Sequence, residues 1–117
     1  MTVKGLLELA ADGDAATVRL IAEAGREIGV ATANLCNLIN PERVIIGGDL
    51  SAAGELITEP IAESIRRYAI PSAAEQVSVV PGVLGDRAEL LGALALVVQP
   101  PGRFLASPPP WREVAAA

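Results

Sequence analysis

A chain of 117 residues with 51% apolar and 20% charged side chains is long enough to form one folded domain. Its net charge of −5 gives no electrostatic reason for contact with nucleic acid or an anionic membrane. One cysteine and no histidine exclude an internal disulfide and an ordinary His/Cys metal site, and they are typical of a reducing cytosol.

The sequence predicts neither secretion nor a membrane anchor. The first five residues, Met-Thr-Val-Lys-Gly, lack the basic, apolar and small-residue order of a signal peptide. The uncharged run 28–41 is shorter than the ~20 residues that span a bilayer, and Asn34 and Asn37 interrupt it. We therefore expect this run to be a core helix of a cytoplasmic protein.

Two helices are predicted before the first strand. The apolar spacing over residues 2–11 predicts a short helix that Asp12-Gly13 closes. Asp14 can cap a much longer helix, which ends at Asn40 because Pro41 follows. Its predicted apolar stripe comprises Val18, Ile21, Gly25, Ile28, Thr32, Leu35 and Ile39.

The second half of the long helix carries no charge between Glu27 and Glu42. We expect this half to be sheltered on all sides. Its small residues, Gly25, Gly29, Ala31 and Ala33, would let either a sheet or a helix of a second subunit approach closely. The sequence therefore predicts a homodimer through residues 28–39, which include Ile28 and Ile39.

A short β-branched run follows at Val44, Ile45 and Ile46. It predicts a strand covered on both faces, as in parallel sheets. Gly47 and Gly48 end this strand. A glycine turn at the carboxyl end of such a strand is where α/β sheets admit a ligand close to the backbone.

The remaining elements alternate between helix and strand. Ser51 can cap a helix with the ridge Ile57, Ile61 and Ile65, whose main body is predicted from about Thr58 to Tyr68 because of Pro60. Residues 77–80 predict a second strand that Pro81 stops, so the connection is a right-handed parallel crossover. Asp86 and Glu89 resemble a capping box that opens a last helix through Val98.

The chain is thus predicted to be an α/β segment over residues 1–99, followed by an irregular Pro-rich tail over residues 100–117. Two short parallel strands cannot be covered on both faces and paired on both edges. We expect them to belong to a larger sheet, completed by upstream sequence or by a second copy of the chain.

The order of these segments resembles the C-terminal region of the ROK family, which comprises bacterial sugar kinases and sugar-responsive transcriptional repressors. The resemblance is carried by Ala-Asn-Leu-Cys-Asn-Leu-Ile-Asn-Pro-Glu at 33–42, Val-Ile-Ile-Gly-Gly at 44–48 and Ala-Gly-Glu-Leu at 53–56. It continues through Glu-Pro-Ile at 59–61, the valines at 77–80 and Leu-Gly-Asp-Arg-Ala-Glu-Leu-Leu-Gly-Ala at 84–93.

This resemblance implies the last helices and strands of a ribonuclease H-like, actin-like ATPase domain. The family's phosphate loop, catalytic aspartate, zinc motif and winged helix have no counterpart in these 117 residues. We therefore expect that this polypeptide by itself neither phosphorylates a sugar nor binds an operator. ATP and Mg²⁺ would be cofactors only if the parent protein is a kinase.

By resemblance, the candidate nucleotide-binding residues are Gly47, Gly48 and Asp49. The alternative is a tight turn that only glycine permits. Family kinases commonly carry a third glycine in place of Asp49, and an aspartate would repel a polyphosphate unless a cation intervenes. The sequence Asp-Arg-Ala-Glu at 86–89 also looks more like the repressors. We expect the regulatory and dimerisation segment of a sugar-responsive repressor; the alternative is the nucleotide side of a glucokinase-like sugar kinase.

The other polar residues are predicted to have structural rather than catalytic roles. Cys36 lies in the uncharged helix without partners, which indicates an inert buried thiol. Asn34, Asn37 and Asn40 either bridge to another subunit or satisfy nearby backbone groups. Four acidic residues are assigned to helix starts or solvent instead of a catalytic set: Asp49, Glu55, Asp86 and Glu89. No catalytic, sugar-binding or metal residue is predicted.

Overall fold

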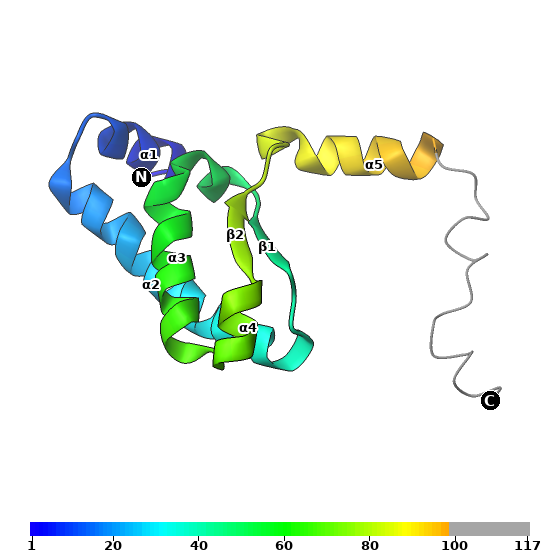
Figure 1. Ribbon diagram of the computed structural model, residues 1–117. Coiled ribbons are helices and arrows are strands. Elements are labelled where there is room, and N and C mark those ends of the chain that lie inside the picture. The colour runs from blue at the N-terminus through cyan, green and yellow to red at the C-terminus, as the bar shows by residue number, and fades with distance from the viewer. Residues whose placement is uncertain (99–117) are drawn as a thin grey trace. The chain divides into compact units, whose positions relative to one another are not determined.

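The computed structural model describes residues 1–98, and the chain divides into two units at the boundary between Asp86 and Arg87. The first unit contains α1 (Val3–Ala11), α2 (Ala15–Ile39), β1 (Arg43–Ile46), α3 (Glu55–Tyr68), α4 (Pro71–Gln76) and β2 (Ser78–Pro81) (Figure 1). Short 3₁₀ helices lie at Asp49–Ala53 and Gly85–Arg87, and α5 (Ala88–Val98) follows. The predicted Pro-rich tail at 100–117 lies outside the described residues.

Both predicted N-terminal helices are confirmed, together with the residues that end them. Thr2 Oγ1 accepts a hydrogen bond of 3.1 Å from the Gly5 amide at the start of α1. Asp14 Oδ2 accepts one of 2.8 Å from the Thr17 amide at the start of α2. Asn40 ends α2 in the left-handed conformation, with φ of 46°. The predicted residues Asp14 and Asn40 therefore set the bounds of α2, and Asp12 ends α1 as predicted, whereas the Thr2 cap was not predicted.

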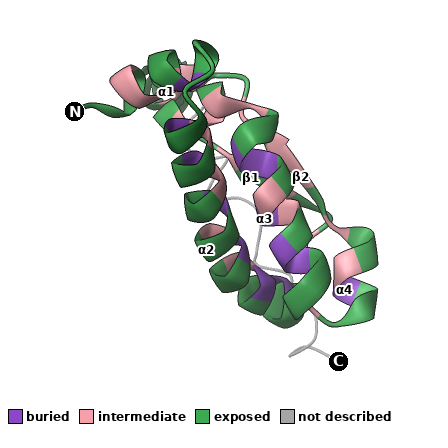
Figure 2. Ribbon diagram, turned by 90° about the vertical axis from the view of Figure 1, so that its left-hand side faces the viewer, coloured by how far each residue is buried: buried purple, intermediate pink, exposed green. Residues whose placement is uncertain are grey.

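The core lies where α2 packs against α3, and Figure 2 shows the buried residues along their facing sides. The predicted ridge of α3 is confirmed, because Ile57, Ile61 and Ile65 are fully or almost fully buried. A Cβ on Gly29 would lie 2.5 Å from Ser64 Cβ and 2.7 Å from the Ile61 carbonyl oxygen. The two helices approach this closely only because α2 presents a glycine there.

The strands β1 and β2 pair in parallel, with Arg43 opposite Ser78 and Ile46 opposite Pro81. This confirms that the two predicted strands are parallel, with α3 and α4 in the connection between them. The prediction that β1 is covered on both faces is wrong for the first unit, because its helices pack on one side of the strands (Figure 1). Val44 and Ile46 pack against the core, whereas Ile45 is 64% exposed.

The described residues do not shelter the second half of α2 on all sides. Its buried side follows Gly25, Gly29, Ala33 and Cys36, steps of three and four that track the straight line of α3. The end of the predicted stripe lies outside that line: Leu35 is 55% exposed and Ile39 70% exposed, and their neighbour Leu38 is 80% exposed. Another surface must cover these residues if they are to be shielded from water.

The starts of the later helices differ from the prediction. Helix α3 begins at Glu55 with Gly54 as its cap, so Pro60 lies inside it. Ser51 belongs to the 3₁₀ turn and donates from Oγ to the Gly48 carbonyl at 2.7 Å. Helix α4 was not predicted, since Pro71 starts a helix here instead of only ending one.

The last helix, α5, begins at Ala88, after a 3₁₀ turn that contains Asp86. Its described residues are intermediate or exposed within the chain, including Leu94 and Val97. Within residues 1–98, no helix combines the length and the apolar character needed to cross a bilayer.

Candidate functional site

A cavity of about 390 Å³ lies beside the loops that leave the carboxyl ends of β1 and β2. The two loops leave the sheet at the same end because the strands are parallel. Helix α1 contributes two side chains to the wall. The lining residues are Lys4, Leu7, Gly48, Asp49, Ser51, Ala52, Gly85 and Asp86. Parallel α/β sheets bind ligands at this end, so this cavity is the candidate site.

The turn after β1 is shaped by Gly48, whose φ of 70° lies in the left-handed region that favours glycine. The Gly48 carbonyl accepts hydrogen bonds from the Ser51 amide at 3.1 Å and from Ser51 Oγ at 2.7 Å. These bonds hold the 3₁₀ turn that begins at Asp49. The conformational requirement for glycine is therefore met by the turn itself, without reference to a ligand.

The charges around the cavity are predominantly negative. Asp49 and Asp86 line it from the β1 and β2 loops, and Lys4 is the single basic residue among the lining side chains. Both aspartates are exposed to solvent. Across the described residues, no group of three or more His, Cys, Asp or Glu side chains is arranged to hold a metal ion. An anionic ligand would meet repulsion from two carboxylates here.

The structure brings together two of the three residues that the resemblance singles out. Gly48 and Asp49 line the cavity, whereas Gly47 is not among the lining residues. Asp86 also lines it, although its sequence signal predicts only a helix cap. The two predicted parallel strands could have indicated that Asp86 lies near Asp49. The loops that follow neighbouring parallel strands begin at the same end of the sheet. Lys4 carries no such signal.

The other acidic candidates occupy helix starts. Glu55 lies in the first turn of α3, and Glu89 lies in the first turn of α5. Negative side chains at these positions interact favourably with the helix dipole. Asp49 and Asp86 line the cavity, whereas Glu55 is not among its lining residues.

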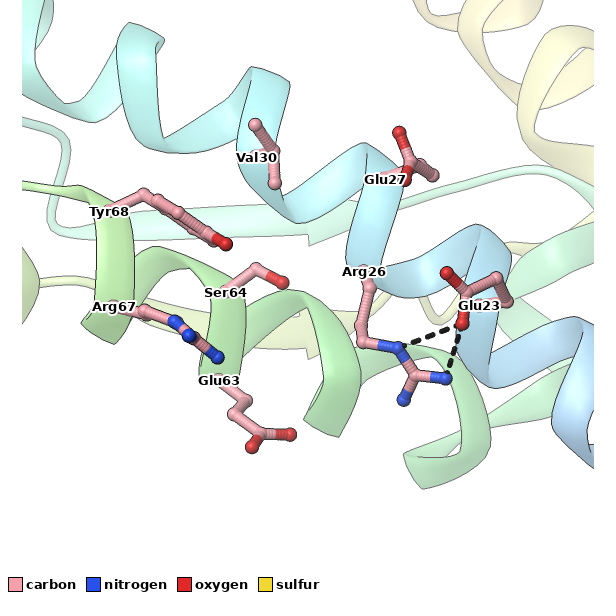
Figure 3. A pocket seen from close by; sticks show the side chains of 8 residues that line it. All are labelled: Glu23, Arg26, Glu27, Val30, Glu63, Ser64, Arg67 and Tyr68. Carbon is pink, nitrogen blue, oxygen red and sulfur yellow. Dashed lines mark hydrogen bonds and ion pairs between the residues drawn. The ribbon is translucent and has the colours of Figure 1, made fainter.

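A second cavity, of about 190 Å³, lies between α2 and α3 on their solvent side (Figure 3). Glu23 and Arg26 form an ion pair across 2.6 Å at its edge, with both side chains about half exposed. Exposed pairs of this kind contribute little to stability. Arg67 lies over the ring of Tyr68, 5.6 Å from its centroid. Because the cavity is lined by both acidic and basic side chains, its charges favour no particular class of ligand.

Cys36 and the asparagines of α2 have structural environments. Cys36 is fully buried, and burial raises the pKa of its thiol, which leaves the unreactive protonated form. Asn37 Oδ1 accepts a 2.8 Å hydrogen bond from the Ile70 amide, and Asn40 Nδ2 donates to Gln76 at 3.3 Å. Asn37 thus satisfies a backbone group, as one of the two predicted alternatives requires.

Comparison with known proteins places this chain in a family. A sequence model described as "ROK family" matches residues 1–100. The chain is 33% identical over 99 residues to a glucokinase of Halalkalibacterium halodurans, covering 85% of this chain and 30% of that protein. It is 31% identical over 93 residues to the DNA-binding transcriptional repressor Mlc of Escherichia coli, covering 80% of this chain and 23% of the repressor.

The structure is similar to that of a ROK family glucokinase from Streptomyces griseus, solved in complex with glucose and AMPPNP, with a TM-score of 0.69 and 36% identity. The match covers 80% of this chain and 30% of that one. The chain thus spans about 30% of the length of the glucokinases it matches and has part of the ROK sugar-kinase fold. Because the family model extends over all the described residues, the chain belongs to the ROK family.

Proposed function

We propose that this chain is the C-terminal regulatory and dimerisation segment of a sugar-responsive ROK transcriptional regulator. The observation that carries the proposal is the pair Asp49 and Asp86 at the cavity beyond β1 and β2. This role belongs to the cytoplasm. The segment itself supplies structure: it does not contact DNA and holds no cofactor.

The two carboxylates argue against a nucleotide site. A kinase stabilises the phosphates of ATP with positive charge and backbone donors. Each carboxylate within about 4 Å of a phosphate charge would instead cost from about 1 kcal/mol in bulk water to about 4 kcal/mol near a protein surface. Lys4 offsets one of the two negative charges at most. The electrostatics of the cavity therefore favour a regulator over a kinase.

Nucleotide binding provides the direct test. We expect that millimolar AMPPNP, with or without Mg²⁺, leaves the melting temperature of the chain unchanged. A ligand present at 100 times its Kd would add about 2.7 kcal/mol of stability, which a thermal melt detects easily. A Mg²⁺-dependent rise in melting temperature that is lost in Asp49→Asn, but kept in the exposed control Glu75→Gln, would contradict the proposal.

The second candidate is the nucleotide side of a ROK sugar kinase similar to the glucokinases. It is favoured by 36% identity to the Streptomyces griseus glucokinase. In that case Asp49 and Asp86 would be the residues that hold Mg²⁺, which prefers oxygen ligands, and the ion would offset the negative charge of the phosphates. The Mg²⁺-dependent result above would select this candidate, with ATP and Mg²⁺ as its cofactors.

The dimer belongs to the proposal as well. Leu38 lies about two and a half turns from Gly29 and therefore on the side of α2 away from α3, and it is 80% exposed. A second copy packed there would bury it together with the charge-free half of α2. Light scattering should give the mass of a dimer for the unmodified chain and of a monomer for Leu38→Asp. A dimer that also survives Leu38→Asp would place the interface elsewhere; Leu9→Asp on α1 is the control.

A further inference from the structure

Ser64 is the one buried residue among the described residues that line the cavity between α2 and α3, and it is 5% exposed. Its Cβ lies against Gly29 of α2. This contact requires a small residue on α3, and alanine would meet the requirement without adding a polar group. The packing of the two helices therefore explains the size of Ser64 but not its hydroxyl.

The Ser64 hydroxyl has no hydrogen-bond partner within the part of the chain that the structure describes. The side-chain hydroxyls that donate hydrogen bonds there belong to Thr17, Thr32, Ser51, Thr58 and Ser78. No side-chain nitrogen or oxygen of residues 1–98 is both enclosed and without a partner, so Ser64 Oγ opens onto the cavity. A hydroxyl on a nearly buried residue is costly unless it is hydrogen-bonded, and a molecule in the cavity can supply that bond.

The charges of the cavity favour no ligand class as a whole, but the way in which they pair narrows the choice. The ion pairs of the described residues are Glu23–Arg26 and Glu59–Arg66. Glu63 and Arg67 are four residues apart, a spacing at which glutamate and arginine commonly pair on a helix, yet they form no ion pair in this part of the chain. Arg67 lies over the Tyr68 ring instead. One carboxylate and one guanidinium therefore remain available beside Ser64.

Figure 3 shows these groups at the cavity. The ends of Arg67 and Tyr68 lie on either side of Ser64. The Glu63 carboxylate projects from the same helix, and Glu27 of α2 points away from them. The guanidinium fork and the two hydroxyls can donate hydrogen bonds to a carboxylate. The Glu63 carboxylate can accept one from an ammonium group. A small zwitterion complements both kinds of group.

The cavity also limits the size of the ligand and the nature of its side chain. Its volume is about 190 Å³, which is below the roughly 300–1,000 Å³ of pockets for drug-sized ligands. Val30 and the ring of Tyr68 place apolar surface beside the polar groups. An α-amino acid with a short aliphatic side chain combines this size with an ammonium, a carboxylate and an apolar group.

We propose that the cavity between α2 and α3 is a binding site for a small aliphatic α-amino acid. The carboxylate of the ligand accepts hydrogen bonds from Arg67, Ser64 Oγ and the Tyr68 hydroxyl. Its ammonium group donates to Glu63, and its side chain contacts Val30 of α2, so the ligand joins the two helices. The site is independent of the choice between regulator and kinase, because none of its residues lines the cavity beyond β1 and β2.

L-Valine is the probe, and NMR titration of the full, isotope-labelled chain measures its binding. We expect saturable shifts of the Ser64 and Arg67 amides with a Kd of about 10 mM or tighter, which is a modest affinity per atom for a ligand of this size. Isovalerate is valine without its ammonium group, and isobutylamine is valine without its carboxylate. Each should bind about tenfold more weakly than valine, because it loses a charged contact. The lack of a saturable shift with valine, or equal binding of either analogue, would overturn the proposal.

Ser64→Ala tests the hydroxyl that the packing of the helices does not explain. The variant should weaken valine binding about tenfold, since a hydrogen bond to a charged group is lost. The melting temperature of the free chain should stay the same or rise, because alanine favours a helix more than serine does. Unchanged valine binding in Ser64→Ala would contradict the assigned role of the hydroxyl and overturn the proposal.

The charged residues are tested against exposed neighbours on the same helix. Glu59 and Arg66 are the controls, because they pair with each other and do not line the cavity. Arg67→Gln should weaken the binding of valine and of isovalerate, whereas Arg66→Gln should weaken neither. Glu63→Gln should weaken the binding of valine but not of isovalerate, and Glu59→Gln should leave both unchanged. Equal losses in the cavity variants and in their controls would mean that the probes bind to surface charge in general, and the proposal would be wrong.

Discussion

Single residues decide how closely the two long helices approach. Gly29 lies against Ser64 and the backbone of Ile61, with no room for a methyl group. The sequence indicates a small-residue side of α2 but leaves its partner open between a sheet and a second subunit. The structure shows that the partner is α3 of the same chain, because only folding brings the Ile57–Ile61–Ile65 ridge alongside.

Gly29→Ala should therefore destabilise the chain by about 1–3 kcal/mol, the usual range for overpacking a core. Gly5→Ala is the matched control. Its Cβ would lie 3.4 Å from Thr2 Oγ1, and the change should stabilise helix α1 by up to about 1 kcal/mol. Urea denaturation measures both. Equal destabilisation by the two variants would show that Gly29 is not in the tight contact described.

Asp14 makes the start of α2 sensitive to pH. The hydrogen bond from the Thr17 hydroxyl, followed by the one from the Thr17 amide, lowers the pKa of this carboxyl below its ordinary 3.8. Because the folded-state pKa is lowered, the cap contributes its full stability above the ordinary pKa of 3.8. This contribution disappears as the pH falls through the folded-state pKa.

Asp14→Asn keeps a capping oxygen but cannot titrate. Thermal melts between pH 2 and 6 should show a smaller acid-induced loss of stability for Asp14→Asn than for the unmodified chain. Asp12→Asn, at a neighbouring carboxylate outside the cap, should retain the full loss. An unchanged pH profile in Asp14→Asn would contradict the assigned hydrogen bonds.

At the scale of elements, helix α3 is the centre of the first unit, because it contacts α2, α4 and β2. Its ridge is read directly from the spacing of its isoleucines. Its start cannot be read in this way. Proline favours the first turn of a helix, so Pro60 predicts a start near Thr58, whereas the helix begins at Glu55. Helix α3 continues through Pro60 because Gly54 caps its first turn and the packing against α2 outweighs one lost hydrogen bond.

The burial of α3 gives a matched pair of substitutions. Ile61 is fully buried and Ile45 is 64% exposed, so the same removal of one methylene should have different costs. Ile61→Val should lower the free energy of unfolding by about 0.5–1.5 kcal/mol. Ile45→Val should stay within about 0.5 kcal/mol of the unmodified chain. Chemical denaturation compares them, and equal losses would mean that the exposed face of β1 is covered.

At the scale of the whole molecule, the boundary between the two units lies at Asp86 and Arg87. The first unit holds all the buried apolar residues of the described chain, and α5 has none. Among the arginine and lysine residues that the structure describes, we expect limited trypsin digestion to cut first after Arg87 and to leave a fragment with the melting temperature of the full chain. Arg87→Gln should remove this first cut. Early cleavage within α2 or α3 instead would show that the first unit is not the stable one.

The candidate site shows how far sequence reasoning reaches. A glycine turn at the end of a β-branched strand indicates the location of the cavity, and the family resemblance selects Gly48 and Asp49. Lys4 and Asp86 line the cavity because the chain brings α1 and the loop after β2 to the same end of the sheet. Local pattern carries no information on which distant loops meet there, so the negative charge of the cavity emerges only in three dimensions.

The sequence by itself determined the end of α1, the caps of α2, the apolar ridge of α3, the two short strands with their parallel connection, and membership of the ROK family. These features depend on spacing and on local backbone preferences, which neighbouring residues impose. Only the tertiary structure decided which side of α2 is buried, that β1 is covered on one face by the first unit, and that Asp49 and Asp86 share a cavity. Those outcomes depend on which surfaces meet, and contacts between residues far apart in the chain decide that.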